Sequence, residues 1–235
     1  MYAMRRTRHT AIVAVCIMIA TAAASSAAPS RPAPKPAAPD YVILDPNGPD
    51  AVTTAEGVFM PMGPIDKDTL IVVENPDGSL PGGMSMSDVA ALARARAAGD
   101  VAAMTSLAFD ADPTAVAAAG NVTAAAAYSY AAAPNIWTAP YRGTNIIGTN
   151  SSVRVYYSFS VTPATNQQAA GQGTGYYVGY NGSQFGTWMK WYGLGIASDG
   201  SNGGGSVPWG NVAATAQFRA MSTVLHGAFG YFTAS

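Results

Sequence analysis

GYYVGYNGSQFGTWMKWYGLGIAS, residues 175–198, is the stretch that determines the fold of the C-terminal half of this 235-residue chain. Two runs rich in aromatic residues flank Asn181-Gly182. This dipeptide favours a tight β-hairpin, because both central residues of a type I′ turn need a positive φ. Residues 176–180 and 185–197 are therefore predicted to pair as antiparallel strands.

Further strand patterns lie on both sides of this hairpin. Residues 152–162 alternate between buried and exposed character, and so do residues 211–220. Residues 225–232 form an apolar run that predicts a last strand. Five such strands, joined by turns rich in Gly and Asn, predict an antiparallel all-β domain over residues 135–235, a sandwich or small barrel of about five to seven strands.

The chain begins with the features of a signal peptide, which we expect to span residues 1–28. Arg5, Arg6 and Arg8 precede an apolar run at 11–24 that is too short to cross a bilayer, and small residues follow it. A basic pair is common in any signal peptide, so we favour the general secretory route over the twin-arginine route. The Ala-, Gly- and Pro-rich composition is typical of a bacterial export protein, and a secreted or cell-wall-associated location is expected.

Cys16 is the only cysteine of the chain and lies inside the apolar run of the signal peptide. A lipid anchor is not expected there, because Val15 precedes the cysteine and more apolar residues follow it. The mature chain would then lack disulfides and depend on burial for its stability, which roughly 200 residues can provide. No later apolar run is long enough to predict a membrane span in the mature chain.

Residues 29–39 are predicted to be a Pro/Ala-rich linker, followed by an acidic segment over residues 40–134. Within this segment short strands are expected at 41–44 and 69–73. A helix is expected at 87–98, with Ser87 as its N-cap and Gly99 as its stop, and a second helix at 101–109. Residues 114–119 are also predicted to be helical, and 124–133 are ambiguous. The whole chain is therefore assigned to the α+β class.

Charge divides the chain into two unequal parts. Residues 36–112 carry twelve acidic and three basic side chains, a balance of −9, whereas residues 113–235 carry one acidic and four basic ones, a balance of +3. Either the two segments are independently composed, or the acidic one is a pro-region that is cut off near residues 131–134. The sequence leaves open whether the strands at 41–73 join the C-terminal sheet. Four dispersed cations are too few to predict nucleic-acid binding.

The aromatic segment is poor in catalytic residue types. Residues 135–235 contain no Glu, no Cys, one Asp and one His. They cannot supply the carboxylate pair of a glycosidase or the ligands of a zinc site, and no metal or cofactor is expected. A hydrolase that uses His226 with Asp199 remains an alternative, but Asp199 lies in a glycine-rich stretch, 198–205, which is expected to be a flexible loop.

Aromatic side chains are the remaining candidates for function. They are numerous: nineteen of the 23 aromatic residues lie between Tyr128 and Phe232. In 185–197, Trp188, Tyr192, Leu194 and Ile196 are expected on one face, and Phe185, Met189 and Trp191 on the other. Either both faces are buried in a two-sheet core, or some of the rings form an exposed surface for a cell-wall polymer, a carbohydrate or a protein. The candidate residues of such a surface are Tyr177, Tyr180, Trp188, Trp191, Tyr192 and Trp209.

The sequence therefore predicts a secreted, non-enzymatic protein whose aromatic β-domain binds an envelope or extracellular partner or self-associates. One alternative is an antimicrobial or toxin-like β-domain that is released from its acidic pro-region. The other is the hydrolase with His226.

Overall fold

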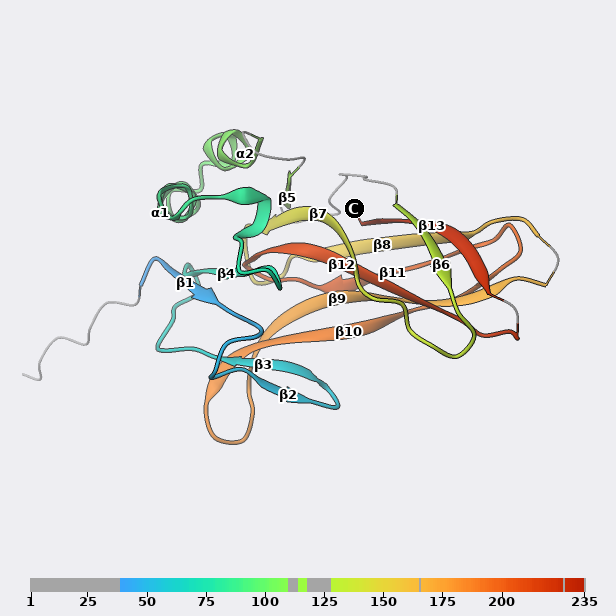
Figure 1. The fold of residues 1–235 in the computed structure, drawn as a ribbon. Helices are drawn as coiled ribbons and strands as arrows, with labels where there is room; N and C mark the ends of the chain where they lie inside the picture. Colours follow the sequence, from blue (N-terminus) through green and yellow to red (C-terminus); the bar gives the residue numbers. More distant parts are fainter. Residues whose placement is uncertain (1–38, 110–113, 118–127, 165, 226, 235) are drawn as a thin grey trace, which may run out of the picture. The chain divides into compact units, whose positions relative to one another are not determined.

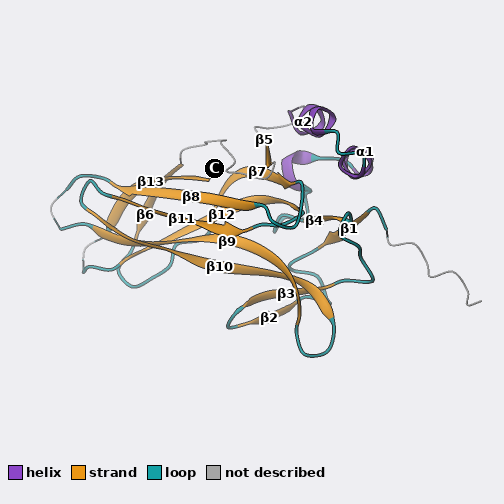
Figure 2. Ribbon diagram, turned by 180° about the vertical axis from the view of Figure 1, so that it is seen from behind, coloured by secondary structure: helices purple, strands orange, loops and turns teal. Residues whose placement is uncertain are grey.

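The structure is a computed structural model, and it describes residues 39–109, 114–117, 128–164, 166–225 and 227–234. Strands account for 51% of these residues and helices for 13%, so the protein is mainly β. The strands form a mixed sheet, here called sheet A, and an antiparallel sheet, sheet B (Figures 1 and 2). The predicted signal peptide and all but the last residue of the predicted linker lie outside the described residues.

Sheet A has the strand order β1-β4-β12-β9-β10-β3-β2, and β7 and β5 branch from β12. The bounds of its strands are β1 Tyr41–Leu44, β2 Val52–Thr54, β3 Gly57–Pro61, β4 Leu70–Val73, β5 Thr114–Ala117, β7 Tyr141–Gly148, β9 Gln168–Tyr180, β10 Phe185–Ser198 and β12 Val212–Ser222. The pairs β1–β4, β4–β12 and β5–β7 are parallel, and the other pairs are antiparallel.

Sheet B has the order β11-β8-β13-β6, and all its pairs are antiparallel. Its strands are β6 Tyr128–Ala132, β8 Arg154–Val161, β11 Asn202–Pro208 and β13 Ala228–Ala234. The predicted alternation in β8 is confirmed: Val155, Tyr157, Phe159 and Val161 are buried. They belong to the main apolar core, which also contains Phe218 and Ala214 of β12 and Tyr176 of β9. Side chains of the two sheets therefore share one core.

The strands of the acidic segment are paired with the C-terminal strands: β1 to β5 lie in sheet A and β6 lies in sheet B. Ile71 and Val72 of β4 pair with Val212 and Ala213 of β12, and β3 pairs with β10. A buried side-chain bond reinforces the junction, because Asn211 Nδ2 donates to the carbonyl oxygen of Thr69 at 2.6 Å. All four residues of β4 are buried, since Ile71 and Val73 contact the main core and Leu70 and Val72 contact a second one.

The second core lies between sheet A and the helices α1, Met86–Ala97, and α2, Val101–Phe109 (Figure 1). Both helices were predicted, and Gly99 ends α1 with a φ of 68°. The N-cap prediction was wrong by one half-turn: Ser85, not Ser87, caps α1. Ser85 forms a capping box with Asp88, whose carboxylate accepts from the Ser85 backbone N–H at 2.8 Å.

The hairpin of β9 and β10 is confirmed, but its turn is not the predicted two-residue type. Four residues, 181–184, connect Tyr180 to its partner Phe185. Asn181 does not have a positive φ; its Oδ1 instead accepts from the backbone N–H groups of Ser183 and Gln184, both at 3.0 Å. The Asn side chain thus stabilises a longer loop, as it does in other Asx turns.

A bulge in β10 corrects the predicted arrangement of its faces. The register with β9 shifts between Gly193 and Ile196, and Gly195 has a φ of 90°. Because the bulge inserts one extra residue, the alternation changes phase after Leu194. Ala197 is therefore buried while Ile196 is 59% exposed, contrary to the predicted common face of Leu194 and Ile196.

Other sequence predictions fail where glycine and alanine dominate. Residues 114–117 form β5 and not the predicted helix, because they pair with β7. The expected flexible loop at 198–205 is largely strand β11, whose Gly203 packs directly against the ring of Phe159. Strands β2, β3 and β7 were not predicted. Within residues 135–235, seven strands are described, β7 to β13.

Candidate functional site

Two of the predicted surface tryptophans are buried, so they do not contribute to an exposed surface. Trp209 has 0% exposure, packs edge-on against Tyr176 at a centroid distance of 4.9 Å, and donates from Nε1 to the carbonyl oxygen of Val212 at 2.8 Å. Trp188 is 8% exposed, because Phe59 of β3 covers it with a centroid distance of 5.0 Å. For these two residues the alternative of a packed core is the correct one.

Tyr177 is half-buried and belongs to a cluster with Trp188 and Lys190. Lys190 Nζ lies 5.1 Å from the centroid of Tyr177 and 4.8 Å from that of Trp188. The same ammonium group donates to Glu56 Oε2 at 2.8 Å, and this bond lowers the pKa of the Glu56 carboxyl and raises that of Lys190. The cluster is therefore satisfied by contacts within the chain.

Trp191 and Tyr192 are both half-buried but point to opposite faces of β10. Tyr192 packs against the main core, and burial raises its pKa. Trp191 lies on the other face against Arg219, whose guanidinium carbon is 4.4 Å from the ring centroid. Tyr180, the last predicted residue, is 57% exposed at the end of β9 beside Phe185. The six predicted residues therefore do not form one surface.

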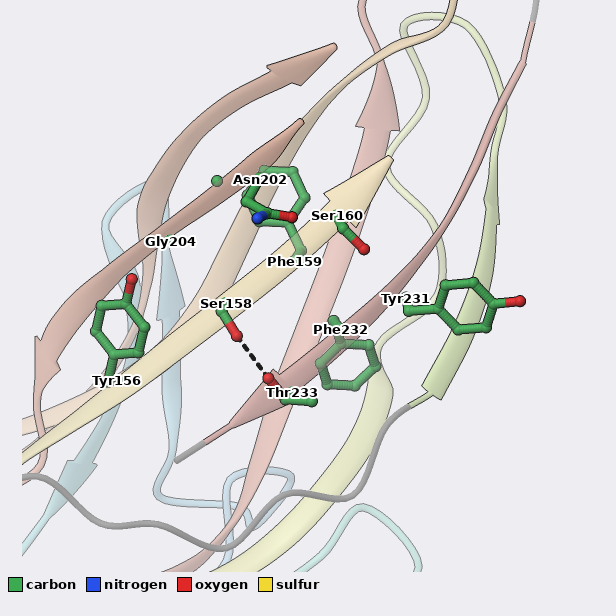
Figure 3. Close-up of a pocket in the computed structure, with 10 residues that line it drawn as sticks. Tyr156, Ser158, Phe159, Ser160, Asn202, Gly204, Tyr231, Phe232 and Thr233 are labelled. Carbon is green, nitrogen blue, oxygen red and sulfur yellow. Dashed lines mark hydrogen bonds between the residues drawn. The ribbon is translucent and has the colours of Figure 1, made fainter. Parts of the chain in front are cut away.

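Three exposed rings lie instead on the outward side of sheet B, and Figure 3 shows two of them, Tyr156 and Tyr231. Tyr156 of β8 is 40% exposed, and Tyr231 and Phe229 of β13 are 54% and 57% exposed. Successive side chains of a strand point to opposite faces of the sheet. Val155 and Tyr157 of β8 and Phe232 of β13 point inward and fill the core. Their neighbours along each strand, Tyr156 on β8 and Tyr231 on β13, therefore point outward. We call this surface the sheet B face.

A shallow pocket of about 380 Å³ lies on the sheet B face between the rings. Tyr156 and Tyr231 stand at its two ends, and hydroxyl-bearing side chains lie between them (Figure 3). Tyr231 is the cross-strand partner of Ser160, four residues from Tyr156 on β8. At about 3.3 Å per residue the two aromatic positions are thus separated by roughly 13 Å along the strand.

Two hydroxyl groups lie in the middle of the pocket. Ser158 Oγ and Thr233 Oγ1 form a hydrogen bond of 2.5 Å across β8 and β13 (Figure 3). Gly204 of β11 contributes no side chain, and its backbone lies under Tyr156: a Cβ there would come within 2.8 Å of the Tyr156 hydroxyl oxygen. The glycines of β11 therefore keep this part of the face open and let the tyrosine lie across it.

None of the residues that line this pocket is charged. Its lining consists of Tyr156, Ser158, Phe159, Ser160, Asn202, Gly203, Gly204, Tyr231, Phe232 and Thr233. The nearest cation on the same strand, Arg154, donates from Nη2 to the carbonyl oxygen of Ser206 at 2.7 Å. Aromatic rings, hydroxyl groups and an amide without charge are suited to bind an uncharged hydroxylated ligand rather than an ion.

Of the two alternative catalytic residues, Asp199 lies in the described part of the chain. The carboxylate of Asp199 accepts from the backbone N–H groups of Asn166 at 2.8 Å and Gln167 at 2.5 Å, as a turn aspartate does. His226 lies outside the described residues. Among the described residues, no group of three or more His, Cys, Asp or Glu side chains could hold a metal ion, and no described helix is long and apolar enough to cross a membrane.

The sequence contained the signal for the sheet B face. The alternation of β8 places Tyr156 outward beside Ser158 and Ser160, and the period of β13 places Tyr231 opposite its buried neighbour Phe232. What the sequence could not give is the pairing of β8 with β13, which joins these positions into one surface. A comparison with known proteins finds no family model, no curated protein and no solved structure that matches this chain.

Proposed function

We propose that this protein is a secreted, non-enzymatic binding protein that holds an uncharged polysaccharide on the sheet B face. The observation that supports it is the pair of exposed tyrosines at the two ends of an uncharged, hydroxyl-lined pocket. Pyranose rings present apolar C–H faces and polar edges. Aromatic rings match the first and hydroxyl groups match the second.

The open form of the pocket favours a polymer over a small, enclosed ligand. The pocket is an open surface formed by three strands of sheet B, β8, β11 and β13, and Tyr156 and Tyr231 are spaced for contacts at separate points of one extended chain. A sandwich of sheets A and B would hold the two tyrosines rigidly, because both lie on strands rather than loops. The signal peptide predicted at residues 1–28 would deliver this face to the cell wall or the exterior.

The toxin-like alternative receives less support from the contacts within the chain. Release of residues 40–134 would remove β4 from β12, β3 from β10 and β6 from β13. It would uncover Trp188 and the apolar residues of β12 that β4 and the helices bury. We therefore propose that the acidic segment stays joined to the aromatic one as part of the folded protein.

A sedimentation assay tests the proposed function. The mature chain is mixed with washed cellulose, with chitin and, as a control, with an inert insoluble resin of equal surface area. Depletion from the supernatant by at least one neutral polysaccharide, saturable and insensitive to 1 M NaCl, is expected, because the residues that line the pocket carry no charge to be screened. Binding that disappears in salt, or no binding to any neutral polysaccharide, would contradict the proposal.

A further inference from the structure

Arg219 occupies an unusual position on the face of sheet A that points away from the main core. Its guanidinium carbon lies 4.9 Å from the centroid of Trp137 and 4.4 Å from that of Trp191, so that it contacts two indole rings. Its Nε donates to Gln172 Oε1 at 2.8 Å, and Gln172 is its direct cross-strand partner on β9. These three contacts fix the plane and the direction of the guanidinium group.

No carboxylate neutralises Arg219 among the residues that the structure describes. Of its five N–H donors, only the one on Nε has a hydrogen-bond partner there. Burial alone lowers its pKa, and no neighbouring acid raises it. Arginine in a partly buried setting is normally paired with an acid, since its planar fork matches a carboxylate. Here the fork is held in place by the rings while its outer N–H groups have no such partner.

The guanidinium lines a groove of about 410 Å³ between the β2–β3 hairpin and the strands β9, β10 and β12. Thr53, Thr54 and Gln172 give the groove uncharged groups that form hydrogen bonds, and its apolar part consists of Ala55, Val58, Met189 and Trp191. Glu56 also lines it, but its carboxylate is engaged with Lys190 at 2.8 Å. Among the described residues, the groove thus offers the guanidinium of Arg219 without an ion pair, several polar groups and a small apolar surface.

We propose that this groove binds a sugar acid, a hydroxylated ring that carries a carboxylate, with Arg219 as the residue that pairs with the carboxylate. The outer N–H groups of the fork match the two carboxylate oxygens. The hydroxyl groups of the ring match Thr53, Thr54 and Gln172, and its C–H face matches Met189. This site is separate from the sheet B face and does not depend on the function proposed for it.

Isothermal titration of the mature chain with trigalacturonate, at low ionic strength, tests the proposal. Its methyl ester, which has the same rings without the charge, is the matched ligand. We expect the acid to bind at least about tenfold more tightly than the ester, because a hydrogen bond to a charged group is worth more than a neutral one. Tyr231→Ala, on the sheet B face, should leave this affinity unchanged, which keeps the two sites distinguishable.

Two variants separate the charge of Arg219 from its packing. Gln172→Glu retains Arg219 and both indole rings but supplies an internal carboxylate to the fork, so it should reduce binding of the acid at least tenfold without loss of the folded state. Glu56→Gln is the matched control, which removes an acid from the groove and should preserve or strengthen binding. Equal affinity for acid and ester, no binding of the acid at millimolar concentration, or full binding by Gln172→Glu would overturn the proposal.

Discussion

The hydroxyl groups of Ser158 and Thr233 form a hydrogen bond of 2.5 Å across β8 and β13, between the rings of Tyr156 and Tyr231. This bond lies in the middle of the pocket. A polymer that contacts both rings would pass over these two hydroxyl groups. A bulky charged side chain at this point would block the path. The centre of the sheet B face can therefore be tested without changing either ring.

Ser158→Lys should abolish binding to a neutral polysaccharide while the protein remains folded. The lysine would place a long cationic chain in an uncharged pocket, and the lost hydroxyl bond costs only about 1 kcal/mol. Gln184→Lys in the exposed β9–β10 loop adds the same charge elsewhere and should bind as the wild type does. Sedimentation with cellulose or chitin, together with a thermal unfolding curve for each variant, measures both effects. Retained binding by Ser158→Lys would place the polymer elsewhere.

Trp209 lies in the buried core, so we expect its replacement to affect stability. Its side chain is fully buried against Tyr176, and its indole N–H is hydrogen-bonded to Val212. Trp209→Ala should lower the free energy of unfolding by about 3–5 kcal/mol, because a large cavity replaces the ring. Urea unfolding followed by circular dichroism measures this loss. A change below 1 kcal/mol would contradict the buried position.

Two glycines provide a matched test of close backbone packing. At Gly148 of β7 a Cβ would collide with the carbonyl oxygen of Gly210, whereas at Gly193 of β10 it would meet no atom within 4 Å. Gly148→Ala should therefore destabilise the protein by at least about 2 kcal/mol, while Gly193→Ala should stay within about 0.5 kcal/mol of the wild type. Denaturant midpoints of the two variants, measured in parallel, give the change in the free energy of unfolding for each. Equal midpoints would show that Gly148 does not approach the backbone of Gly210 in this way.

Asp77 and Arg142 make the stability dependent on pH at the acid end. Arg142 Nη1 donates to Asp77 Oδ2 at 2.8 Å, and this bond, with those from Ser79, holds the pKa of Asp77 well below its ordinary value of 3.8. The carboxylate therefore stabilises the folded state fully above pH 4, and this contribution is lost as the pH falls toward the lowered pKa.

Asp77→Asn should accordingly reduce the melting temperature at pH 7 but have a smaller effect at pH 3. The pair is exposed, so 1 M NaCl at pH 7 should also shrink the difference. Melting temperatures of the wild type and the variant across this pH range measure the dependence. A difference that grows toward acidic pH would contradict the assigned direction.

Local patterns in the sequence identified much of the fold. The alternation of β8, the apolar strands β1 and β4, the β9–β10 hairpin and both helices were predicted correctly, since each depends on residues close in the chain. The errors occur where the residues are mostly Gly and Ala, because such segments show no alternation between apolar and polar side chains. Strand β11 looks like a loop because its glycines have no side chains, and its conformation depends on the rings of β8 that pack against it.

The candidate site was harder to predict than the fold. The aromatic richness of β10 pointed to Trp188 as an exposed residue, but a distant segment supplies Phe59 to cover it. Conversely, Tyr156 and Tyr231 lie 75 residues apart in sequence and become one surface only through the pairing of β8 with β13. Exposure and proximity of this kind follow from long-range strand pairing, which no local pattern encodes.

The most direct measurement for the central claim compares two tyrosines of similar exposure. Tyr231, on the sheet B face, is 54% exposed, and Tyr180, at the end of β9, is 57% exposed. In sedimentation with the polysaccharide that the wild type binds, Tyr231→Ala should weaken the affinity about tenfold, which corresponds to ~1.4 kcal/mol, and Tyr180→Ala should leave it within about twofold. Wild-type affinity for Tyr231→Ala, or an equal loss in both variants, would contradict the claim that the sheet B face is the binding surface.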